Sequence, residues 1–142
     1  MRMIYAVAVL VLALPVLRAA GHDESTLATA LKEVAEKSVE AYDAKNIDDM
    51  LRYVHTKSPE YERTREQLAV EFKIREVRAE LVKFRYIGHD DEFAVARIKF
   101  KTVAPGNDEF QDNIVDSLTV FHQEDGVWKF WSDYILGVEL IE

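Results

Sequence analysis

The stretch Phe110–Ser132, FQDNIVDSLTVFHQEDGVWKFWS, decides how this chain folds. It contains two runs rich in β-branched and aromatic residues, and the four residues Gln-Glu-Asp-Gly separate them. A short segment that ends in Asp-Gly between two such runs is typical of a β-hairpin. We therefore predict an antiparallel pair of strands over residues 110–122 and 128–138.

The same two-residue period extends toward the N-terminus as far as residue 76. It predicts two further strands, at 76–86 and 93–102, with a turn at IGHDDE and a loop at VAPGNDE. Three consecutive hairpins make a four-stranded antiparallel meander.

The chain before residue 73 has a helical period instead. Residues 23–45 place Leu27, Leu31, Val34 and Ser38 at helical spacing, and Lys45-Asn46 interrupts the pattern. A short helix, IDDMLRYV, follows, and a third begins near Ser58-Pro59 and ends near Phe72. Helices that all precede the meander must cover one of its faces, so the predicted fold class is α+β.

This layout resembles the nuclear transport factor 2-like (SnoaL-like) superfamily. The resemblance rests on AYDAKNIDDMLRYV, where one helix breaks and a short one follows, and on the segment 110–132. It implies a cystatin-like cone in which a curved antiparallel sheet wraps around a long first helix. The superfamily includes isomerases, dehydratases and binding proteins, and its members often form homodimers through the outer sheet face.

Residues 1–20, MRMIYAVAVLVLALPVLRAA, have the layout of a secretory signal peptide. The apolar run from Ile4 to Leu17 is short for a membrane span, although an uncleaved anchor is the alternative. Cleavage after Ala19 or Gly21 leaves suitable residues before the cut. We therefore expect a periplasmic or secreted domain over residues 23–142, with no membrane contact after cleavage.

Charge and composition exclude several functions. Without Arg2 and Arg18, the chain has 16 basic and 26 acidic residues, a net charge of −10, which disfavours binding to nucleic acid or anionic lipid. It has no cysteine, so disulfides and thiolate metal sites are excluded. The four histidines show no metal-ligand spacing, and no phosphate loop or nucleophile elbow occurs, so we expect no metal site and no cofactor.

Pairing the first two strands through their turn gives two distinct faces. The inner face is apolar and should lie under the helices; it comprises Val82, Phe84, Tyr86, Ala94, Ala96, Ile98 and Phe100. The outer face carries Lys83, Arg85, Arg97, Lys99 and Lys101. This basic face is either a solvated surface, a reader of anionic groups or a dimer contact.

Continuing the pairing through the 103–109 loop places Asp112, Asp116 and Tyr134 on the inner face. A carboxylate in an apolar cone beside a phenol suits an isomerase or dehydratase, with Asp116 as general acid or base and Tyr134 as hydrogen-bond donor. The alternative is a structural hydrogen-bonded pair. A slip of one residue in the loop would turn both aspartates outward.

A pocket for a small apolar ligand is the remaining hypothesis. We expect Asp112, Trp128, Phe84, Ile98, Tyr42 and His55 to line it. Trp131 lies three residues after Trp128 and should face the other side, beside Arg97 and Lys99, where it stacks on a cation or enters a homodimer interface. The leading interpretation is a ligand-binding or accessory protein; the alternatives are an enzyme using Asp116 and Tyr134, and an envelope protein acting through its outer face.

Overall fold

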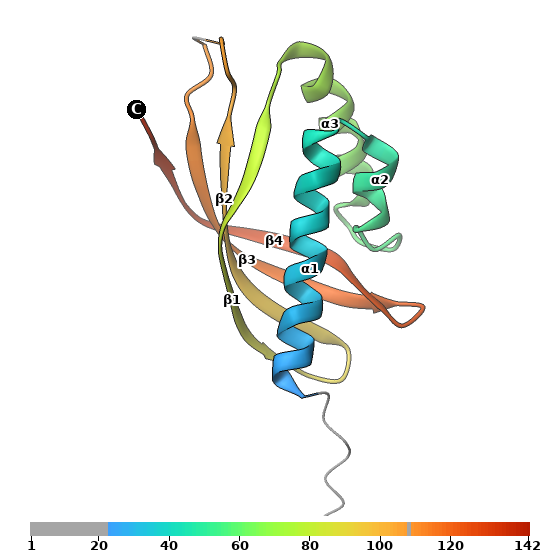
Figure 1. Cartoon of the computed structure of the whole chain (residues 1–142). Helices are drawn as coiled ribbons and strands as arrows, with labels where there is room; N and C mark the ends of the chain where they lie inside the picture. The colour runs from blue at the N-terminus through green and yellow to red at the C-terminus, as the bar shows by residue number, and fades with distance from the viewer. Residues whose placement is uncertain (1–22, 108) are drawn as a thin grey trace, which may run out of the picture.

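The computed structural model describes residues 23–107 and 109–142, so the predicted signal peptide lies outside the described residues. Three helices precede four strands, as the sequence predicts (Figure 1). The elements are α1 Glu24–Asp43, α2 Ile47–Arg52, α3 Tyr61–Ile74, β1 Arg78–His89, β2 Phe93–Val103, β3 Asn113–Glu124 and β4 Val127–Leu140.

Side-chain caps set the starts of the first two helices. The Asp23 carboxylate accepts a hydrogen bond from the backbone N–H of Ser25 at 3.3 Å, and the Asn46 side chain accepts one from Asp49 at 3.1 Å. Each cap satisfies a backbone donor that has no partner within its helix. The Lys45-Asn46 break therefore ends one helix and begins the next.

The four strands form one antiparallel sheet in the order β1-β2-β3-β4. The sheet is curved, and α1 runs along one of its faces with α2 and α3 beside it (Figure 1). This is the predicted α+β cone. In the described part of the chain, no helix has the length and apolar character needed to cross a membrane.

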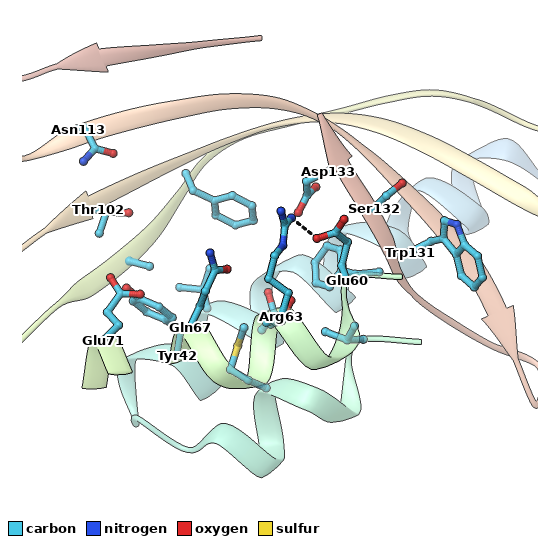
Figure 2. Close-up of a pocket in the computed structure, with 18 of the residues that line it drawn as sticks. Tyr42, Glu60, Arg63, Gln67, Glu71, Thr102, Asn113, Trp131, Ser132 and Asp133 are labelled. Carbon is cyan, nitrogen blue, oxygen red and sulfur yellow. Dashed lines mark ion pairs between the residues drawn. The ribbon is translucent and has the colours of Figure 1, made fainter. Parts of the chain in front are cut away.

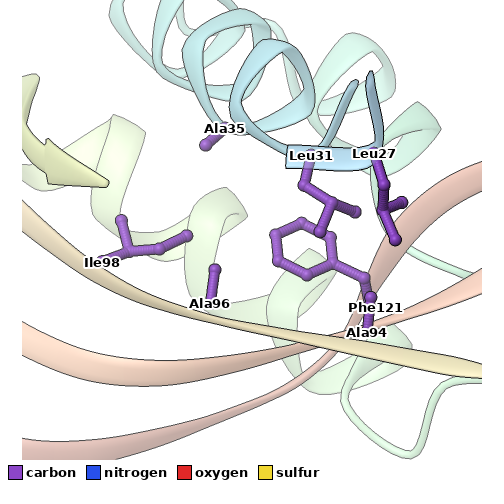
Figure 3. Packing of buried hydrophobic residues seen from close by; sticks show 7 residues of the cluster. All are labelled: Leu27, Leu31, Ala35, Ala94, Ala96, Ile98 and Phe121. Carbon is purple, nitrogen blue, oxygen red and sulfur yellow. The ribbon is translucent and has the colours of Figure 1, made fainter. Parts of the chain in front are cut away.

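The core lies between the first half of α1 and the centre of the sheet (Figure 3). Leu27, Leu31 and Ala35 project from α1 onto β2 and β3, where Phe121 is fully buried. The remaining members of this cluster are Ala94, Ala96 and Ile98. Because two of the strand residues are alanines, the helix approaches the sheet closely at this end.

The inner and outer faces of β1 and β2 are those that the sequence predicts, with one correction. Phe84, Tyr86 and Phe100 pack against the core, but the Val82 side chain is 46% exposed. An irregularity between Leu81 and Lys83 shifts the register, so Leu81 packs inward in place of Val82.

The predicted register between β2 and β3 is wrong. Asp116 pairs with Lys99 and Ser117 with Ile98, whereas the sequence pairing placed Ile98 beside Ile114. An offset of three residues is odd, so it turns the whole strand over. Ser117, Thr119 and Phe121 are the buried side chains of β3, and Asp116 faces outward with Lys99.

The C-terminal half of β4 is exposed. It runs away from the helices to the chain end (Figure 1), and Tyr134, Ile135, Leu136, Val138 and Leu140 are each more than half exposed. Tyr134 pairs with Leu118, a neighbour of the buried Thr119, so it lies on the outer face and not in the cone as predicted.

Candidate functional site

A pocket of about 500 Å³ lies between the second half of α1, helix α3 and the inner face of the sheet (Figure 2). Aromatic and aliphatic side chains form about half of its lining, namely Val39, Tyr42, Met50, Val54, Ala79, Phe100, Phe110, Phe130 and Trp131. The polar lining consists of Ser38, Glu60, Arg63, Thr64, Gln67, Glu71, Thr102, Asn113, Ser132 and Asp133. Ligand sites in proteins are commonly pockets of this size, apolar with a few convergent polar groups.

Asp133 is the pocket carboxylate that β4 provides. Its Oδ1 accepts a hydrogen bond from the Thr119 hydroxyl at 2.6 Å. The residue is solvent-exposed where it lines the pocket, although Thr119 and other protein groups lie close around its carboxylate. This surrounding protein raises the pKa of Asp133; the Thr119 bond opposes that shift, and the charge of Glu60 adds to it.

Glu60 and Arg63 lie beside Asp133 at the start of α3 (Figure 2). The Arg63 guanidinium forms an ion pair with the Glu60 carboxylate, one helical turn away. Among the described residues, no cation forms an ion pair with Asp133.

Tyr42 and Glu71 lie together at another part of the pocket (Figure 2). Burial raises the pKa of the Tyr42 phenol, and the neighbouring Glu71 carboxylate raises it further. The phenol therefore stays protonated and can donate a hydrogen bond at neutral pH.

The residues predicted to be catalytic do not meet in this pocket. Asp116 accepts a bidentate hydrogen bond from Arg97, at 2.8 and 2.6 Å, on the outer face, and the Lys99 ammonium lies 3.7 Å away. The Arg97 bond lowers the pKa of Asp116. Because Tyr134 pairs with Leu118 and is 61% exposed, the expected Asp116–Tyr134 pair inside the cone is wrong.

The predicted ligand-binding residues are dispersed. Tyr42 lines the pocket, whereas Ile98 is fully buried and Phe84 packs against the core. Trp128 borders a second, smaller groove against α1. The Asp112 carboxylate accepts a hydrogen bond from the Ala104 N–H at 3.1 Å, which fastens the loop before β3.

His55 lies in the loop between α2 and α3 and is 5% exposed. The backbone N–H of His55 donates a hydrogen bond to the backbone carbonyl of Phe130 at 2.9 Å, and Val54 forms a parallel bridge with Phe130. The loop therefore continues the sheet beyond β4. The His55 ring packs edge-on against Trp131 and His122, at centroid distances of 5.0 and 4.8 Å. His55 thus forms an aromatic cluster with His122 and with Trp131, which lines the pocket and is half-buried, whereas the sequence placed Trp131 beside Arg97 and Lys99.

None of the ten polar lining residues was predicted from the sequence to line a pocket, and Glu60, Arg63 and Asp133 show why. Glu60 is the N-cap residue of α3 and Arg63 lies in its first turn, and because Leu68 is the single buried residue of this helix, their spacing matches an ordinary solvated helix. Asp133 follows an irregularity in β4 between the partners of Val120 and Phe121, which the strand period does not reveal. Within residues 23–107 and 109–142, no group of histidines and acids is arranged to hold a metal ion.

The family model described as the C-terminal domain of the anti-sigma-I factor RsgI9 matches residues 33–141, most of the chain. The chain belongs to this family. The match spans the helices and the sheet that enclose the pocket. No curated protein sequence matches the chain.

Solved structures share the fold of this RsgI9 C-terminal domain family member at low identity. A hexachlorocyclohexane dehydrochlorinase from Novosphingobium barchaimii has 10% identity and a TM-score of 0.63, over 84% of this chain and 92% of that protein. A conserved protein from Planctomyces limnophilus has 12% identity and a TM-score of 0.63, over 80% and 96%. A protein of unknown function with a cystatin-like fold from Nostoc punctiforme has 11% identity and a TM-score of 0.62, over 75% and 87%. The fold is the cystatin-like α+β cone of these structures, which is the fold that the sequence resemblance implied.

Proposed function

We propose that this protein is a periplasmic or secreted binding or accessory protein that holds a small, largely apolar ligand in its cone. The observation that carries the proposal is the pocket of about 500 Å³, lined by rings from both the helices and the sheet. Its volume suits one small organic molecule.

Two further observations support binding over catalysis. The Asp116 carboxylate, the predicted base, is held by Arg97 on the outer face and is remote from any pocket ligand. The matched family is also described as the C-terminal domain of an anti-sigma-I factor, a description that refers to the regulation of a sigma factor and names no reaction. A ligand-binding domain in such a protein would report the presence of its ligand.

We further propose that the protein acts as a homodimer through its outer sheet face. The exposed Tyr134 supplies apolar area on the outer face of β4, and β1 adds the exposed cations Lys83 and Arg85. Exposed apolar groups of this kind often mark protein interfaces. Analytical ultracentrifugation of the wild type and of Tyr134→Glu tests this: a dimer that the substitution dissociates agrees with the proposal, and a wild-type monomer contradicts it.

Native mass spectrometry of the purified protein tests the binding function. We expect a co-purified small molecule on the wild type and none on Thr102→Trp, which fills the pocket from β2. A matched control, Thr29→Trp, adds the same ring on exposed α1 outside the pocket and should keep the ligand. A ligand retained by Thr102→Trp would place it elsewhere.

A second candidate function is proton transfer by an isomerase or dehydratase-like enzyme, with Asp133 in the role predicted for Asp116. The raised pKa of Asp133 and its access to the pocket favour it, because a carboxyl of this kind can exchange a proton. Incubating the extracted ligand with protein separates the two functions. A ligand that returns unchanged supports binding, whereas conversion that Asp133→Asn abolishes supports the enzyme.

Secretion has its own test. The full chain expressed in a bacterium should appear in the periplasm or medium, with an N-terminus that follows Ala19 or Gly21. Retention in the membrane with Met1 intact would contradict secretion and support an anchor.

A further inference from the structure

We propose that the pocket selects an organic cation, an amine on an apolar body, over neutral and anionic molecules of the same shape. This inference rests on the proposed binding function and specifies the ligand's chemical class.

The charged side chains of the pocket lining do not balance one another. The lining includes three carboxylates, from Glu60, Glu71 and Asp133, and one cation, from Arg63. Arg63 is committed to Glu60 by their ion pair. Among the described residues, neither Glu71 nor Asp133 forms an ion pair, so the pocket carries two carboxylates whose charge no side chain neutralises.

The surroundings of Asp133 also favour a cationic ligand. The only side-chain donor to Asp133 in the described residues is the Thr119 hydroxyl, which bonds Oδ1 at 2.6 Å. The residue is solvent-exposed where it faces the pocket, and the protein around its carboxylate together with the like charge of Glu60 raises its pKa. A ligand ammonium would relieve both effects, because it supplies a charged donor to each carboxylate.

The apolar part of the lining suits an organic cation as well. Five aromatic rings surround the space: Tyr42, Phe100, Phe110, Phe130 and Trp131. Aromatic faces attract cations and also bury an apolar body. An anion would meet the rings' negative faces and two unpaired carboxylates, and it would have to displace Glu60 from Arg63.

Isothermal titration of the full chain with three probes near pH 7 tests the inference. The probes are 2-phenylethylamine, which is a cation, 2-phenylethanol, which is neutral, and 3-phenylpropanoate, which is an anion. We expect the amine to bind about tenfold more tightly than the alcohol, since a charged hydrogen bond in a partly desolvated site commonly contributes that factor. The anion should bind most weakly.

Two substitutions assign the preference to named groups. Asp133→Asn removes the charge but keeps an oxygen for Thr119, and it should weaken the amine about tenfold while leaving the alcohol unchanged. Glu60→Gln releases Arg63, so it should weaken the amine and strengthen 3-phenylpropanoate.

A matched control lies on the same helix. Glu62 and Arg65 form an equivalent ion pair one turn apart, and neither lines the pocket. Glu62→Gln removes the same charge at the same distance in sequence from its arginine, so it should leave all three affinities within about twofold. Thermal unfolding of each variant verifies that it is folded.

The outcomes separate this inference from the proposed function. Equal binding of the amine and the alcohol, or tighter binding of the anion, overturns the cation preference while the binding function stands. The absence of binding by all three probes, together with no co-purified ligand, overturns both. Because the wild-type series needs no substitution, a variant that fails to fold does not prevent a decision.

Discussion

The two ends of the cone contain the same two layers but are packed in opposite ways. At one end, hereafter the closed end, Leu27, Leu31 and Ala35 of α1 form one buried cluster with Ala96 and Phe121 of the sheet (Figure 3). At the other, the open end, rings from helices and sheet surround a pocket of about 500 Å³ (Figure 2).

The difference follows from side-chain size and from which helix covers the sheet. Alanines on β2 let α1 approach the closed end, whereas Phe100 and Thr102 farther along the same strand face α3, which buries a single residue, Leu68. The closed end therefore stabilises the fold, and the open end is left for a ligand. Substitutions at the two ends should differ accordingly.

The largest difference should come from removing one ring at each end. Phe121→Ala deletes a fully buried ring and should lower the free energy of unfolding by about 3–5 kcal/mol. Phe110→Ala removes a half-buried ring that already borders empty space, and it should cost under about 1.5 kcal/mol. Urea denaturation measures both; equal losses would remove the distinction between the ends.

Adding volume should give the next largest difference. Ala96→Leu forces extra methyl groups into a filled core and should destabilise the protein by about 1–3 kcal/mol. Thr102→Leu adds comparable bulk beside the pocket and should change the stability by less than about 0.5 kcal/mol. Thermal unfolding of the two variants, both on β2, gives the comparison; a tolerated Ala96→Leu would mean that the closed end is not filled.

The smallest effect on stability should come from removing the charge of Asp133 at the open end. Asp116, which is paired with Arg97 on the outer face, serves as the reference. The raised pKa of Asp133 means that ionisation of this carboxyl lowers the stability of the folded protein. The loss appears as the pH rises past 3.8, the ordinary pKa of an aspartate. Asp133→Asn should therefore raise the melting temperature slightly at pH 7 and leave it unchanged near pH 3.

Asp116→Asn should act in the opposite direction. The lowered pKa of Asp116 means that its charge stabilises the fold above pH 3.8, and this contribution is lost as the pH falls through the folded-state pKa. The variant should melt below the wild type at pH 7, with a difference that shrinks toward pH 3. Melting curves of the two variants that shift in the same direction at pH 7 would contradict the contrast between the two carboxylates.

Most of the architecture could be predicted from the sequence because its signals are local. The Lys45-Asn46 break, the change of period after residue 73 and the Asp-Gly turn each depend on a few neighbouring residues, and the helices and strands follow them. The faces of β1 and β2 were also predicted correctly for Phe84, Ala96 and Ile98. The predicted register of this short hairpin was off by two residues, and an even shift leaves each side chain on the same face of the sheet.

The site could not be predicted because it depends on register across a long loop. Turns occur at residues 104–107 and 109–110, and the Asp112 carboxylate accepts a hydrogen bond from Ala104, so the number of residues in the loop does not fix the pairing of β2 with β3. The pattern of β3 gives little help, since its buried positions include the polar Ser117 and Thr119 while Ile114 and Val115 are neighbours. The predicted register of β2 with β3 was off by three residues, an odd number, so the prediction placed Asp116 on the inner face. The irregularity in β4 interrupts the strand period, so the period did not predict that Asp133 lines the pocket.

An amide NMR titration of the wild-type protein with 2-phenylethylamine tests most directly the claim that the open end is the binding site. The account predicts saturable shifts at Gln67, Thr102 and Asp133, which line the pocket, and none at Ala94 or Ala96 of the closed end. Shifts confined to the outer face around Arg97, or no saturable shift at any residue, would contradict it.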